Sequence, residues 1–121
     1  MKPASDFEDA QQRLAAIVES SDDAIIGKTL DGIITSWNPG AEKIFGYAAP
    51  EAIGRPILML FPPECVDEEA DILARIVRGE IIDHFETVRI TKSGRRIDVV
   101  VTVAPVKDTH GKIIGVSKVA P

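Results

Sequence analysis

The chain has 121 residues, of which 45% are hydrophobic and 27% charged, and this is the composition of one soluble globular domain. Its formal net charge of −5, with lysines and arginines scattered along the chain, argues against a nucleic-acid-binding surface. A single cysteine cannot form an internal disulfide, and no apolar run reaches the roughly 18 residues of a membrane span. We therefore expect a cytoplasmic domain that contacts neither nucleic acid nor membrane directly.

The N-terminal segment predicts an amphipathic helix. It opens with the capping-box pattern Ser5-Asp6-Phe7-Glu8, and its apolar residues recur at helical spacing. We assign residues 1–22 to this flanking helix and residues 23–121 to the core of the domain. A soluble domain does not leave such a face in water, so the helix either folds back over its own sheet or packs against a partner. We favour a homodimer, whose interface residues would be Phe7, Leu14, Ile17 and Val18.

Two short strands and two short helices are expected next. The strands Ala24 to Lys28 and Ile33 to Trp37 are joined by a tight Asp31-Gly32 turn, which predicts a β-hairpin. Asn38 is suited to cap a helix that begins with Pro39 and ends at Gly46. A further helical turn is expected over residues 50–54.

The second half of the chain predicts one longer helix and three strands. The helix spans Val66 to Arg78, and its expected core face is Val66, Ala70, Leu73, Ile76 and Val77. The strands cover residues 81–91, 95–106 and 112–119, and short glycine-containing turns indicate an antiparallel meander. In the middle strand the alternating set that begins at Ile97 is wholly apolar and should face the core. The class is therefore α+β, with helices on one face of an antiparallel sheet.

Three stretches carry a resemblance to a known family. They are the run Thr35 to Tyr47 (TSWNPGAEKIFGY), the turn Lys92-Ser93-Gly94 and the turn Asp108-Thr109-His110-Gly111. From about Leu14 to Ala120 the chain resembles a PAS domain, a sensory and dimerisation module. The resemblance implies a five-stranded antiparallel sheet with the first hairpin at its centre, and helices that cover its concave face above a cavity.

The same resemblance implies a non-catalytic domain joined to an output domain of the same polypeptide. A histidine kinase is the first expectation for that output domain and a diguanylate cyclase the second. Family members often continue with Asp-Ile-Thr and a helical linker, and this sequence stops at Val119-Ala120-Pro121. We therefore expect it to be a segment of a longer signalling protein.

No cofactor can be named from the sequence. In Gly54-Arg55-Pro56-Ile57-Leu58, Ile57 stands where flavin-binding light sensors of the family have a reactive cysteine, which argues against adduct photochemistry. Glu69 stands nearest to the position of the haem-ligating histidine in oxygen sensors, which argues against haem ligated in that way. Two histidines and one cysteine, far apart in the chain, form no metal-ligand spacing.

The side chains that could react or hold a ligand also fit ordinary packing or surface positions. Cys65 fits a small buried residue at a helix start, His84 and His110 fit solvent-exposed imidazoles, and Trp37 fits a core residue at a strand end. Asp98 is the one candidate acid inside a clear strand, and alternation points it away from the core, so we expect no catalysis.

Two functions remain open at this stage. In the first, a cavity between the sheet and the long helix binds a small, largely apolar molecule and regulates the output domain. The expected pocket residues come from the inward strand positions and the helix face: Leu73, Ile76, Phe85, Thr87, Val99, Val101 and Val103. In the second, the same side chains fill the interior, and the domain serves dimerisation and protein–protein interaction alone. An internal cavity large enough for a ligand distinguishes the two.

Overall fold

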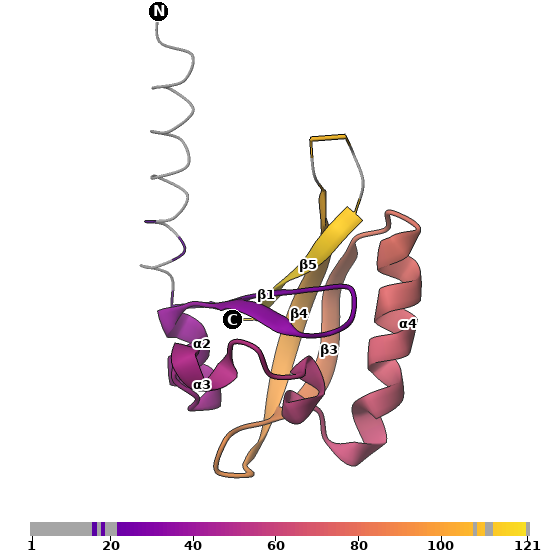
Figure 1. Ribbon diagram of the computed structural model, residues 1–121. Helices are drawn as coiled ribbons and strands as arrows, with labels where there is room; N and C mark the ends of the chain where they lie inside the picture. Colours follow the sequence, from indigo (N-terminus) through magenta and orange to yellow (C-terminus); the bar gives the residue numbers. More distant parts are fainter. Residues whose placement is uncertain (1–15, 17, 19–21, 108, 111–112, 121) are drawn as a thin grey trace, which may run out of the picture.

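Five strands form one antiparallel sheet in the part of the chain that the structure describes. The computed structural model describes residues 16 and 18, residues 22–107, residues 109 and 110, and the backbone of residues 113–120. The strands are β1 (Ala24–Lys28), β2 (Ile34–Trp37), β3 (Ile82–Ile90), β4 (Arg96–Lys107) and β5 (Ile113–Ala120). Their order across the sheet is β2-β1-β5-β4-β3, so the first and last strands of the chain lie side by side. The C-terminal strand therefore joins the two hairpins into one sheet (Figure 1).

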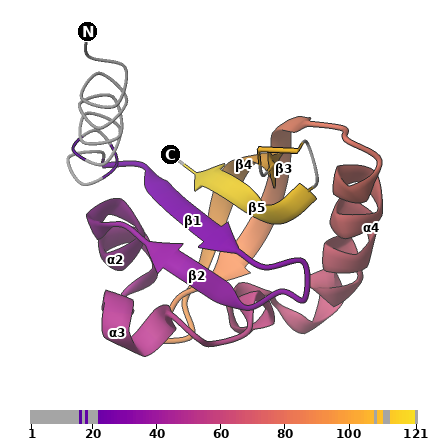
Figure 2. The ribbon, with the colours of Figure 1, turned by 45° about the horizontal axis from the view of Figure 1, so that its top comes forward.

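The helices lie between the two hairpins in the sequence and pack against the sheet. α2 (Pro39–Phe45) and α3 (Ala49–Ala52) lie beside the β1–β2 hairpin, while α4 (Val66–Val77) runs along the other side, next to β3 (Figure 2). Two 3₁₀ turns, η1 (Ile57–Leu60) and η2 (Pro63–Cys65), connect α3 to α4. The core lies between these helices and the sheet, and it includes Trp37 and Phe45.

Asn38 joins three segments of the chain through its side-chain amide. Its Oδ1 accepts hydrogen bonds from the backbone N–H groups of Ile25 (2.8 Å) and Ala41 (2.9 Å). Its Nδ2 donates to the backbone carbonyls of Val18 (3.0 Å) and Asp23 (2.9 Å). All four hydrogen-bonding positions of the amide are thus used, and the residue is buried. Asn38 caps α2 and also fixes how the chain enters the sheet.

Gly40 allows this junction to close. A Cβ built at Gly40 would lie 2.2 Å from the backbone carbonyl oxygen of Asp23, closer than real Cβ atoms approach. Gly46 ends α2 with a left-handed backbone (φ 85°), the conformation that glycine adopts at least cost. The Asn-Pro-Gly run and the later glycine of the sequence signature are therefore explained by local geometry.

Most of the predicted elements are confirmed. The α+β class and the antiparallel sheet are as expected, Asn38 and Pro39 begin α2, and α4 has the predicted start. The hairpin between β1 and β2 forms, and Val99, Val101 and Val103 face the core. Trp37 is buried, with its indole N–H donating to the Tyr47 carbonyl. The predicted flanking helix lies largely outside the described residues; Ala16 and Val18, which are described, have helical backbone.

Two expectations were wrong. The first hairpin is not central, because β2 forms one edge of the sheet and β5 occupies the middle. The core face of α4 was also partly wrong: Ile76 is buried as expected, but Ile72 is the other buried residue of the helix, and the expected Val66 and Val77 are 40% and 53% exposed. The helix is rotated so that two of its glutamates, described below, reach buried cations.

We predict that Asn38→Ala lowers the free energy of unfolding by about 2–4 kcal/mol, because two carbonyls and two N–H groups lose the hydrogen bonds that the buried Asn38 amide makes. Loss of a helix cap alone would cost about 1 kcal/mol. Urea unfolding of the variant, beside the control Thr35→Ala at an exposed position of β2, measures the difference. A loss no larger than that of a cap would contradict the role of Asn38 as a junction.

Candidate functional site

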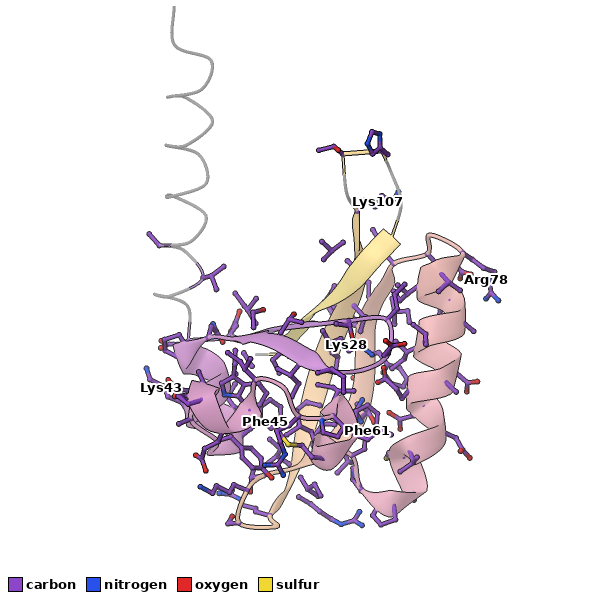
Figure 3. All side chains as sticks on the ribbon, viewed as in Figure 1. Lys28, Lys43, Phe45, Phe61, Arg78 and Lys107 are labelled. Atoms are coloured by element: carbon purple, nitrogen blue, oxygen red, sulfur yellow. The ribbon has the colours of Figure 1, made fainter. Side chains whose placement is uncertain are left out.

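The described residues enclose a small cavity between the helices and the sheet. Its wall takes one residue or more from β1, α2, η1, β3 and β4. The lining residues are Ala24, Ile26, Phe45, Ile57, Leu60, Phe61, Arg89, Val99 and Val101. Figure 3 labels two of them, Phe45 from α2 and Phe61 from the segment that follows η1. Eight of the nine are apolar, and Arg89 is the charged member of the set.

The cavity is nearly filled by its own wall. The enclosed space is about 20 Å³, which is room for about one water molecule. Typical ligand pockets are many times larger, about 300–1,000 Å³. A ligand larger than water can therefore enter this arrangement only if part of the wall moves.

Arg89 is held in the interior by several contacts. Its side chain is 5% exposed, and its Nη1 donates to the Glu68 carboxylate (3.0 Å), to Thr87 Oγ1 (3.1 Å) and to the Val88 carbonyl (2.9 Å). The guanidinium carbon lies 3.8 Å from the centre of the Phe61 ring, a cation–π contact. Its Nη2 is buried without a hydrogen-bond acceptor among the described residues. Burial lowers the pKa of Arg89, and the hydrogen bond to Glu68 opposes that effect.

Glu68 is the acceptor at the centre of this network. Its two oxygens accept from Thr87 Oγ1 at 2.8 and 2.9 Å, and one of them also accepts from Arg89. Burial alone would raise the pKa of Glu68, but hydrogen bonds from Thr87, Cys65 and Arg89 outweigh it and hold that pKa below its ordinary value. The same carboxylate, together with burial, raises the pKa of the Cys65 thiol. Cys65 is therefore a buried neutral thiol, as the sequence indicated.

A second buried ion pair lies next to the first. Lys28, at the end of β1, has a fully buried side chain and pairs with Glu69 of α4, whose side chain is 12% exposed. In Figure 3 the labelled Lys28 lies between β1 and α4. Glu68 and Glu69 are consecutive residues, so one turn of α4 is bound to β3 through Arg89 and to β1 through Lys28.

The expected pocket residues divide into two groups. Val99 and Val101 line the cavity. Ile76 and Val103 are fully buried in the packing between α4 and the sheet, Leu73 and Phe85 are half-buried there, and Thr87 binds Glu68. Of the four expected interface residues, Phe7, Leu14 and Ile17 lie outside the described residues, and Val18 binds Asn38 through its carbonyl.

The sequence analysis did not predict the two buried cations, Lys28 and Arg89. It also did not predict the part of the cavity wall that comes from α2, η1 and the residue after η1. A signal existed for both cations, because Lys28 is in phase with the inward-facing Ala24 and Ile26, and Arg89 with Phe85 and Thr87. Glu68 and Glu69 lie in the first turn of α4, where acidic residues are common because they complement the helix dipole, so their presence alone does not indicate a buried partner. No local pattern indicated that Phe45, Leu60 and Phe61 would meet at one cavity.

The remaining reactive residues lie away from the cavity wall. His84 is exposed at an irregularity of β3, where its φ is 51°, and it pairs with Asp83 (2.9 Å). His110 and Asp98 are exposed as well. Across the described part of the chain there is no group of three or more His, Cys, Asp and Glu residues able to hold a metal ion. Within the same residues, no helix is long and apolar enough to cross a membrane.

Comparison with known proteins agrees with this architecture. The family model described as the PAS fold matches residues 12–119. The chain belongs to the PAS family. A PAS domain from Colwellia psychrerythraea has a similar fold, with a TM-score of 0.86, 22% sequence identity, and coverage of 93% of this chain and 95% of that one.

Two curated relatives are, by name, a signal transduction histidine-protein kinase and a phytochrome. The signal transduction histidine-protein kinase AtoS of Escherichia coli is 33% identical over 101 residues, which are 82% of this chain and 16% of the kinase. A phytochrome of Picea abies is 24% identical over 111 residues, which are 88% of this chain and 10% of the phytochrome. This PAS domain therefore spans only a small part of the length of these relatives.

Acid should destabilise the wild-type PAS domain more than it destabilises the Glu68→Gln variant. Because the folded pKa of Glu68 lies below its ordinary value of 4.5, its contribution to stability is complete above that pH and is lost as pH falls through the folded pKa. Urea unfolding at pH 6 and pH 3 measures the loss, which we expect to be about 1–2 kcal/mol larger in the wild type.

Glu86→Gln, at an exposed position of β3, is the control and should keep the wild-type pH dependence. Equal acid sensitivity of the wild type and Glu68→Gln would show that Glu68 has no special part in stability.

Proposed function

We propose that this chain is the sensory and regulatory PAS domain of a cytoplasmic signal-transduction protein, foremost a sensor histidine kinase. The domain binds a small molecule beneath its helices and passes the change to an output domain of the same polypeptide. The relation to AtoS supports the kinase, and the cavity with a charged residue in its wall supports the ligand.

The observation that carries the proposal is the direct link between the cavity and α4. Arg89 lines the cavity, and the same guanidinium pairs with Glu68 of α4. Because the enclosed space is about 20 Å³, a ligand must displace part of the wall, and displacement at Arg89 reaches α4 through the ion pair. An effect of about 1–3 kcal/mol on the output equilibrium would be typical of allosteric coupling.

A ligand-free module is the second candidate, and the small volume of the cavity favours it. In this alternative the interior side chains fill the space at protein density, and the domain dimerises its parent and positions the output helices. Both candidate functions include the proposed homodimer, with an interface formed by Phe7, Leu14, Ile17 and Val18.

Native mass spectrometry of the chain purified without added ligand tests the proposal. The sensory function predicts a mass in excess of the polypeptide, equal to one small molecule per chain. A clean mass equal to twice the polypeptide would instead support the ligand-free dimer.

The same measurement tests the proposed interface. The double substitution Leu14→Asp and Ile17→Asp should convert a dimer into a monomer, because two charges would be buried between the helices. The control Asp9→Asn, on the polar face expected for the helix, should leave the dimer intact. A dimer that survives the double substitution would remove the N-terminal helix from the interface.

A further inference from the structure

One polar group of the cavity wall has no partner within the described residues. Arg89 is 4% exposed, and its Nη2 is buried with no acceptor, whereas its Nη1 makes three hydrogen bonds. Buried donors without an acceptor are rare in folded proteins, and an exception calls for an explanation such as a bound water or ligand. The other cavity residues are apolar, so a molecule in this space meets one hydrogen-bond donor and otherwise hydrocarbon side chains.

The charges around the cavity are already balanced. Arg89 is paired with Glu68, and Lys28 is paired with Glu69. Cys65 is held neutral by its raised pKa. A ligand with a formal charge would therefore add an uncompensated charge to a buried, apolar space, which is unfavourable. A neutral acceptor atom satisfies Nη2 without that penalty.

We propose that the ligand of this domain is a compact, neutral, mainly apolar molecule with one hydrogen-bond acceptor oxygen, which binds Arg89 Nη2. This inference rests on the proposed sensory function. The apolar body of the ligand would lie against Phe45, Leu60 and Val101, which line the same space. The chemical class includes small ketones, esters and amides, and it excludes carboxylates.

The contacts around Arg89 also indicate which part of the cavity wall would move when a ligand binds. η1 is one 3₁₀ turn, and its hydrogen bonds at Met59 and Phe61 are made to backbone carbonyls only three residues back. Phe61 follows η1 directly and covers Arg89. An acceptor that reaches Nη2 therefore displaces the Phe61 side of the wall. The guanidinium that it binds is the one that anchors α4 through Glu68.

Three molecules of nearly equal shape test the proposal: methyl isopropyl ketone, isobutyrate, and the alkene in which the ketone oxygen is replaced by CH₂. Each is titrated into the ¹⁵N-labelled chain, and backbone amide shifts of the cavity residues report binding. We expect the ketone to bind about tenfold more tightly than the alkene, because a hydrogen bond to a charged donor favours it. Isobutyrate should bind more weakly than the ketone.

Arg89→Lys retains the positive charge that pairs with Glu68 and removes the second donor nitrogen. In this variant the ketone and the alkene should bind within about twofold of each other. Arg95→Lys, an exposed position in the turn after β3, is the control and should keep the preference for the ketone. If Arg89→Lys does not fold, the comparison of the three probes on the wild type decides whether the cavity prefers a neutral acceptor.

The outcomes separate this inference from the proposed function. Equal binding of ketone and alkene would overturn the role of Arg89 and leave a ligand-binding sensor. Tighter binding of isobutyrate would overturn the neutral class. No shift with any probe would overturn the inference, and together with a clean native mass it would also remove the ligand from the proposed function.

Discussion

The position of the long helix depends on two buried cations. Lys28 comes from β1 and Arg89 from β3, and the order of the sheet places two other strands between them. A buried cation without a partner is strongly unfavourable, so each requires a carboxylate within reach. Glu68 and Glu69 supply both from one turn of α4. The pairing fixes the rotation of the helix, which is why Ile72 and Ile76 face the sheet while Val66 and Val77 remain in water.

This arrangement explains what the sequence could and could not predict. Local rules are sufficient for Asn38, Pro39 and Gly46, because capping and left-handed glycine depend on neighbouring residues alone. Alternation is sufficient for the inward set of β4. The rotation of α4 could not be found in that way, because it is set by Lys28 and Arg89, which lie far away in the chain. The central place of β5 is likewise a pairing between the two ends of the domain.

The candidate site shows the same division. Val99 and Val101 followed from strand periodicity and do line the cavity, whereas Phe45, Leu60 and Phe61 come from segments whose meeting depends on the whole fold. Arg89 was in phase with the inward positions of β3, but a charged residue is not normally expected to face a core. Its presence there distinguishes this interior from a purely apolar one and places a charged hydrogen-bond donor in the cavity wall.

The ion pairs also connect the cavity to the surface of the domain. If apolar contacts alone held α4, a molecule could enter or leave the nearly closed cavity without moving any particular part of that helix. Here the wall residue Arg89 and the helix residue Glu68 are bound to each other, and Thr87 and Cys65 hold the same carboxylate. In the proposed sensor, changes at the cavity would therefore act on the N-terminal half of α4 first.

A double-mutant cycle on Lys28 and Glu69 tests most directly whether buried charge positions α4. Lys28→Met alone should destabilise the domain by about 3–5 kcal/mol, because it leaves Glu69 without its partner. Lys28→Met combined with Glu69→Leu should restore most of that loss, so that the coupling energy exceeds about 2 kcal/mol. A coupling energy below about 0.5 kcal/mol would show that α4 is held by its apolar contacts and would contradict this account.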